Sequence, residues 1–340
     1  MARQVHLVGS IGLDTVGEVF ATCGSLLGPH LKRVPDGEPG GRRLWISWQF
    51  AVLRANAYLQ ADTTTHRSGG IGFHPMKLAD GVKPEDVRFG EFGYAREARA
   101  SYLDFVAARD KGILPRDTRF QVSLPTPFAV IGPFCVAEAR EPVLRAYEEA
   151  MLREVAAICD GIPHQDLAIQ WDVCIEMVIW DGGYPSIPSF PGMDKVFGGS
   201  FARLAGAVPE DVELGFHLCY GDLDGVHFVQ PRDAAKMVEL AHLMRDSVKR
   251  SLQWIHMPVP IDRSDEAFFV PLRDLALSPS TELYLGLVHA AGGAEGTRRR
   301  IEAASRAVKD FGIASECGIA RARRPELVRQ ILQTHADAAR

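Results

Sequence analysis

Short runs of apolar residues recur along the chain, and longer stretches with helical spacing of apolar positions separate many of them. Continuous apolar runs of this length, rich in β-branched residues, are typical of strands that are buried on both faces. The sequence predicts eight such strands, near residues 5–10, 30–37, 119–125, 166–174, 212–219, 252–259, 282–289 and 311–318.

Four of the intervening stretches have the pattern of amphipathic helices, at residues 141–161, 231–250, 294–310 and 325–339. Pro142 and Pro231 lie close to the start of the first two, where proline favours the beginning of a helix. Alternation of strands and helices predicts a parallel sheet, and eight such units form a (β/α)8 TIM barrel. An open doubly wound sheet is the alternative, but no glycine-rich dinucleotide motif or P-loop supports it.

Two segments exceed what a minimal barrel needs. Residues 60–95 are rich in glycine, threonine and charge, and residues 179–198 are rich in glycine, proline and aromatic side chains. Long loops in a compact domain often act as lids or binding loops, so we expect both over the C-terminal face of the barrel. With no repeat or low-complexity linker, residues 1–340 are expected to form a single barrel domain.

Composition narrows the class of protein. Apolar residues make up 46% of the chain, charged residues 24%, and the net charge is −5. These values do not suggest a nucleic-acid or membrane partner. No apolar run has the length of a transmembrane helix and the first residues lack the apolar core of a signal peptide, so we expect a cytoplasmic protein that acts on a small molecule, with the oligomeric state open. In a reducing compartment the six cysteines are expected to be free thiols: Cys23, Cys135, Cys159, Cys174, Cys219 and Cys317.

Polar and nucleophilic residues gather at the C-terminal ends of the expected strands, where a barrel carries its active site. They are Ser10, Asp36, Glu38, Asp172, His217, Cys219, His256, His289 and Cys317. Any one of them alone is more simply a hydrogen-bonded or buried core residue.

The pair His217 and Cys219 is more specific, because residues two apart on a strand point to the same side. Imidazole and thiolate are zinc ligands, and Cys317 at the end of the last strand can supply a third. The alternative is a buried histidine beside a buried thiol. The sequence therefore predicts a Zn²⁺ site over the barrel mouth.

Six segments, in order, resemble the cobalamin-independent methionine synthase family, in the wider group that includes uroporphyrinogen decarboxylase and epoxyalkane:coenzyme M transferase. They read LVGSIG, PDGEP, IQWDV, FHLCY, LVHAAGGAEGTRRRIEAA and ASECGIARAR. The resemblance spans almost the whole chain and corresponds to the catalytic C-terminal half of the full-length synthase.

This resemblance implies that His217, Cys219 and Cys317 bind zinc. It further implies roles for four other residues. Ser10, Glu38 and Asp172 would hold an amino-acid thiol substrate, and His289 would donate a proton. The expected activity is that of a zinc-dependent transferase, which moves a methyl or other alkyl group to or from a thiol held as zinc thiolate.

The chain also departs from the family. No glutamate occupies the family's fourth ligand position, so His256 is the nearest candidate, with water or Asp222 as the alternative. Phe134, but no tryptophan, follows LPTPFAVI, which argues against methyltetrahydrofolate as the donor. Arg42 and Trp45 follow PDGEP and could clamp a carboxylate and wall an apolar substrate.

Two other functions remain open at this point. One is a lyase or decarboxylase of the same barrel superfamily, acting on a small carboxylated or aromatic substrate through Asp172 and His289. The other is a barrel that stores or binds metal without catalysis.

Overall fold

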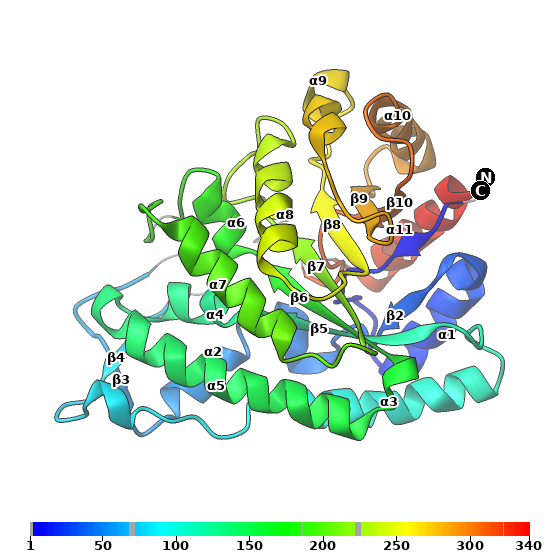
Figure 1. Cartoon of the computed structure of the whole chain (residues 1–340). Helices are drawn as coiled ribbons and strands as arrows, with labels where there is room; N and C mark the ends of the chain where they lie inside the picture. Colours follow the sequence, from blue (N-terminus) through cyan, green and yellow to red (C-terminus); the bar gives the residue numbers. More distant parts are fainter. Residues whose placement is uncertain (1–2, 68–71, 185, 222–225, 322) are drawn as a thin grey trace.

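Eight parallel strands form the centre of the computed structural model, which describes residues 3–67, 72–184, 186–221, 226–321 and 323–340 (Figure 1). The strands are β1 (Val5–His6), β2 (Arg33–Pro35), β5 (Arg119–Pro125), β6 (Leu167–Val173), β7 (Glu213–Leu218), β8 (Trp254–Pro258), β9 (Glu282–Val288) and β10 (Gly312–Ser315). Their order in the sheet is β1-β10-β9-β8-β7-β6-β5-β2.

The sheet curls round so that its two edge strands meet. Isolated parallel bridges join Val5 to Leu31 and Ser10 to Gly37, on the segments that contain β1 and β2. The predicted (β/α)8 barrel is thus confirmed, and the open doubly wound sheet is wrong.

Helices surround the barrel (Figure 1). They are α1 (Val16–Leu27), α2 (Gln49–Arg54), α3 (Tyr94–Asp110), α4 (Pro127–Phe134), α5 (Ala137–Gly161), α6 (Ile175–Trp180), α7 (Met193–Gly206), α8 (Ala235–Ser247), α9 (Glu266–Phe269), α10 (Gly293–Ser305) and α11 (Pro325–Ala339). Among the described residues, none of these helices is long and apolar enough to cross a lipid bilayer.

Neither proline that the sequence placed at a helix start begins a helix. The helix α5 begins at Ala137 and contains Pro142, and α8 begins four residues after Pro231. Proline is instead the first residue of α4, at Pro127, and of α11, at Pro325. Pro142 lies early in α5, so it removes one backbone hydrogen bond near the helix start and α5 continues past it.

The first long segment is less irregular than its composition suggested. It holds the short antiparallel pair β3 (Leu59–Ala61) and β4 (Met76–Leu78), which lies beside α2 and α5 (Figure 1). The backbone N–H of Val136 donates to the carbonyl of Met76 at 2.9 Å, which fixes this pair against the α4–α5 junction. In the second segment, Tyr184 and Ile187 form an antiparallel bridge ahead of α7.

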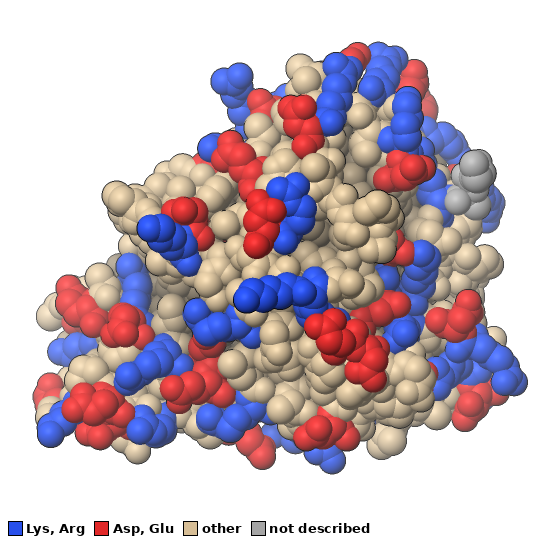
Figure 2. Space-filling model, in the orientation of Figure 1, with Lys and Arg blue, Asp and Glu red and all other residues tan. Residues whose placement is uncertain are grey.

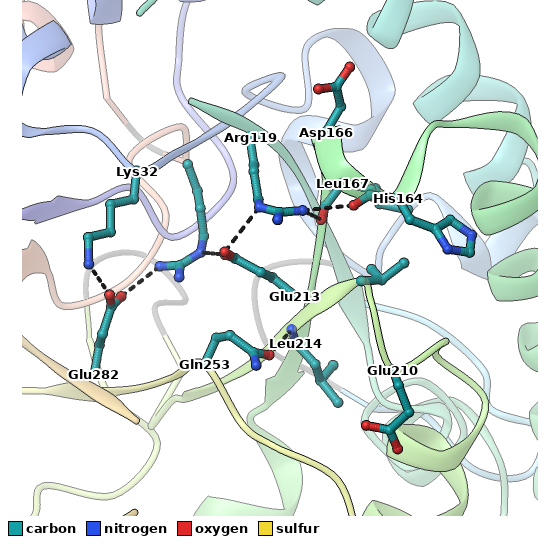
Figure 3. A network of polar contacts seen from close by, with 12 residues as sticks. Lys32, Arg119, His164, Asp166, Leu167, Glu210, Glu213, Leu214, Gln253 and Glu282 are labelled. Carbon is teal, nitrogen blue, oxygen red and sulfur yellow. Dashed lines mark hydrogen bonds and ion pairs between the residues drawn. The ribbon is translucent and has the colours of Figure 1, made fainter. Parts of the chain in front are cut away.

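An ion-pair network lies at the opposite end of the barrel, where the strands begin (Figure 3). Glu213 and Glu282, at the starts of β7 and β9, hold three cations from β2, β5 and the residue before β2: Lys32, Arg33 and Arg119. Arg33 is buried and contacts the carboxylates of Glu213 and Glu282 at 2.5 and 2.9 Å. Its guanidinium lies 4.2 Å from the ring centre of Trp254.

The exposed charges are mixed in sign. Figure 2 shows lysine and arginine interspersed with aspartate and glutamate over the visible face. This distribution agrees with the modest net charge of −5.

Candidate functional site

A pocket opens at the C-terminal ends of the strands and is lined by residues from most of them. Four of the five expected substrate-binding residues line it, namely Ser10, Glu38, Trp45 and Asp172. All three strongest metal-ligand candidates line it as well. Residues far apart in sequence meet here because the ends of parallel strands converge at one rim.

The three metal-ligand candidates form a compact cluster. The ligand atoms of His217, Cys219 and Cys317 all lie within 4.8 Å of one another, and the two Sγ atoms are 3.6 Å apart. Two sulfurs bound at about 2.3 Å to a tetrahedral zinc would be about 3.8 Å apart. The spacing of the sulfurs therefore fits a shared metal ion.

The histidine of this cluster is held in one tautomer by its neighbour on β8. His256 Nε2 lies 3.0 Å from the carbonyl oxygen of Ser315, which can only accept, so Nε2 carries the proton. His256 Nδ1 then accepts from His217 Nδ1–H at 2.6 Å. Burial lowers the pKa of His256 to about 3 and also lowers the pKa of His217, so both rings are neutral.

This arrangement leaves the Nε2 lone pair of His217 without a hydrogen-bond partner, although the atom is buried. Buried polar atoms without partners are rare, and a metal-binding lone pair is one physical explanation. The donor set of the site, one imidazole and two thiols, suits zinc.

The fourth ligand predicted from the sequence stays a prediction. Both ring nitrogens of His256 have hydrogen-bond partners within the protein, namely His217 and the carbonyl of Ser315. In this arrangement the ring of His256 orients His217 and offers no free nitrogen to a metal ion. The alternative, Asp222, lies outside the described residues.

Two carboxyl groups form the polar side of the pocket. Asp172 accepts hydrogen bonds from Gln170 Nε2 at 2.9 Å and from Trp45 Nε1 at 3.2 Å. Burial raises the pKa of Asp172 to about 7. Burial, with the nearby charge of Asp172, raises the pKa of Glu38 to about 8.

The backbone is strained at two of these residues. Glu38 and Trp45 have φ values of +53° and +54°, and in the described part of the chain no other non-glycine residue has a positive φ. Such strain is costly and persists where the surrounding structure holds a side chain in a required position. Here it places a carboxyl group and an indole N–H at the pocket wall.

His289 and Arg42 do not line this pocket. His289 is buried, with Nε2 donating to the carbonyl of Val259 at 2.9 Å and Nδ1 3.8 Å from a Glu316 oxygen. Arg42 forms an ion pair with Asp36 at 2.8 Å and lines a small neighbouring cavity together with Glu38.

Sequence reasoning missed two features of the pocket. Cys174 lines it and forms a hydrogen bond with Cys219 that raises the pKa of the Cys219 thiol. Its place two residues after Asp172 was a usable signal, because alternate strand residues share a face. The second feature is a group of aromatic residues from outside the strands that lie in the same pocket as the predicted Trp45, and no periodic pattern indicated them.

The raised pKa values predict that the metal-free protein loses stability as pH rises. A carboxyl group with a folded-state pKa of about 7 or 8 holds its proton more tightly than in the unfolded chain. Its stabilising effect is therefore complete below about pH 4, falls progressively as pH rises, and is lost once pH has passed the folded-state pKa of about 7 or 8. Between pH 5.5 and 8.5 the free energy of unfolding should therefore fall less in the double variant Glu38→Gln with Asp172→Asn than in the parent protein. We expect the difference between the two falls to be roughly 2–4 kcal/mol.

Urea unfolding of the chelated protein at several pH values measures this difference. The double variant is compared with the parent protein at each pH, so that the contributions of all other titrating groups cancel. Equal pH dependence in the two proteins would contradict the assignment of the raised pKa values to Glu38 and Asp172.

Similarity to known proteins is found at the level of the fold. No protein family and no curated protein matches the chain by sequence. Among solved structures, a B12-independent methionine synthase from Shewanella sp. W3-18-1, in complex with selenomethionine, is similar. The similarity covers 98% of this chain and 97% of that one, with a TM-score of 0.58 and 14% identity. The chain therefore shares its fold, over nearly its full length, with a B12-independent methionine synthase.

Proposed function

We propose that this protein is a zinc-dependent transferase that moves a methyl or other alkyl group to or from a thiol. The observation that carries the proposal is the buried, unpartnered Nε2 atom of His217 beside the thiols of Cys219 and Cys317, which line the same pocket. The solved methionine synthase with selenomethionine supports chemistry at sulfur on this fold.

His217, Cys219 and Cys317 would hold the metal in this proposal, with His256 orienting His217. When bound, zinc lowers the pKa of a substrate thiol so that the thiolate is available at neutral pH. Ser10 and Asp172 line the same pocket and would bind the polar part of the thiol substrate.

We assign proton donation to Glu38 rather than to His289. Glu38 lines the pocket, and its pKa of about 8 keeps it protonated at neutral pH. A group with a pKa near the working pH is well suited to protonate the leaving group. His289 is separated from the pocket and already donates to Val259.

Substitution with Co²⁺ tests the proposal. Two cysteine ligands should give a sulfur-to-cobalt charge-transfer band, and a thiol that joins the coordination sphere should strengthen it. Titration with homocysteine and with simple alkyl thiols measures this change. An unchanged spectrum with every thiol, or product formation by loss of CO₂ without any thiol, would instead support the lyase or decarboxylase.

A further inference from the structure

Aromatic side chains form much of the pocket wall. Six of them line it, namely Trp45, Phe50, Phe73, Phe134, Tyr184 and Phe228. Phe50, Phe73 and Phe134 contact one another, with ring centres 5.0–5.3 Å apart. Tyr184 and Phe228 form a second, edge-to-face pair at 5.1 Å.

These rings come from segments outside the barrel strands. Phe73 lies between β3 and β4, Tyr184 lies between α6 and α7, and Phe228 lies in the connection after β7. Three separate connections thus each place an aromatic ring at one pocket. Packing of the barrel core does not require aromatic rings from these connections. Their convergence therefore indicates a surface that binds a ligand.

The aromatic wall reaches the metal-ligand cluster. The backbone N–H of Gly221 donates to Cys219 Sγ at 3.2 Å. The Phe228 ring packs so closely on Gly221 that a Cβ there would lie 2.4 Å from it. A ring bound against Phe228 would therefore lie next to the sulfur of Cys219.

The charges of the pocket disfavour an anionic ligand. Its charged lining residues, within the described chain, are Glu38, Asp172 and Arg321. Arg321 lies 3.6 Å from Cys317 Sγ and is thus engaged at the metal cluster. Glu38 is protonated at neutral pH because its pKa is raised to about 8, so it offers no positive charge to an anion. A carboxylate or phosphate on the ligand would therefore lie near the carboxyl group of Asp172 and would have, among the described lining residues, only the cation that already contacts Cys317.

We propose that the alkyl donor is an uncharged molecule with an aromatic ring, whose ring binds among these six side chains. This inference rests on the proposed transferase function and names its second substrate. Offset or edge-to-face contacts with aromatic side chains favour a flat ring over an aliphatic group of similar size.

The reaction forms a bond between the thiolate sulfur and the alkyl carbon. The bond between that carbon and the donor's heteroatom breaks, and its electron pair stays on the heteroatom. Glu38 supplies the proton that neutralises the leaving group, so no oxidant or reductant is needed. The products are a thioether and a ring-bearing alcohol, amine or thiol.

Calorimetric titration of the zinc-loaded protein with three probes tests the donor class. The probes are 4-methoxyphenol, which is neutral and aromatic, 4-methoxybenzoate, which is anionic, and cyclohexanol, which is neutral and aliphatic. We expect 4-methoxyphenol to bind roughly tenfold more tightly than either of the others.

The double variant Phe73→Leu with Phe134→Leu keeps apolar bulk and removes two rings, and it should lose most of this preference. Phe190→Leu is the matched control, because Phe190 lies in the α6–α7 connection and is absent from the pocket lining. Equal binding of all three probes, or an unchanged preference in the double variant, would overturn the inference.

The two proposals can fail separately. If thiols still strengthen the cobalt–sulfur band but no neutral aromatic probe is preferred, the donor class is wrong and the transferase stands. If no thiol changes that band, the transferase itself is wrong, whatever the probes do.

Discussion

Cys219→Ser should bind zinc at least roughly 100-fold more weakly than the parent protein. A serine hydroxyl is neutral at pH 7, whereas a zinc-bound cysteine is a thiolate, so the substitution removes both a charge and a strong ligand. The Cys219 sulfur is 3.6 Å from Cys317 Sγ, close to the separation of two thiolates bound to one zinc ion. Elemental analysis and competition with a chromophoric chelator measure the loss.

Cys174→Ser is the matched control for this prediction. Cys174 contacts Cys219 and lines the pocket, but it lies outside the cluster of three mutually close ligand atoms. It should therefore retain about one zinc per chain, as expected for a site with three protein ligands. Full metal in Cys219→Ser at neutral pH would contradict the assigned site.

The variant His256→Asn should have a zinc affinity between those of Cys219→Ser and Cys174→Ser. If His256 orients His217, as the 2.6 Å contact between their Nδ1 atoms indicates, zinc affinity should fall by about 10- to 100-fold. A complete loss of zinc would instead support His256 as a direct ligand.

Arg33→Ala should reduce the free energy of unfolding by about 3 kcal/mol. Arg33 is buried, joins Glu213 to Glu282, and covers the ring of Trp254. Its removal leaves partly buried carboxylates with fewer partners and exposes an indole ring. Urea unfolding of both proteins, loaded with the same metal, measures the difference.

Lys32→Ala is the control because Lys32 pairs with the same Glu282 but its side chain is 49% exposed. An exposed ion pair contributes little, so this variant should lose less than about 1 kcal/mol. Equal losses of unfolding free energy in the two variants would mean that the burial of Arg33 does not add to the stabilising effect of the network.

The barrel and the His-x-Cys pair were predictable because both follow from strand geometry. Strands buried on both faces read as apolar runs, and residues two apart share a face. The apolar run that forms β7 therefore predicts both the strand and the shared face of His217 and Cys219.

Other features depend on contacts that no local pattern encodes. The tautomer of His217 follows from the Ser315 carbonyl, which lies two strands away from β8. His289 follows the end of β9 as expected, but its ring contacts the carbonyl of Val259 and does not line the pocket. The aromatic rings reach the site through loop conformations, which residue spacing does not determine.

The junction between the segments of β1 and β2, called the seam here, should open more easily than the rest of the barrel. Two isolated bridges close it, whereas β6 and β7 are joined in register over six residue pairs. Amide hydrogens along this seam should therefore exchange with solvent sooner than those of β6 and β7. Ser10 and Glu38 lie on opposite sides of the seam. A ligand that contacts both would therefore stabilise this junction and slow the exchange of its amide hydrogens.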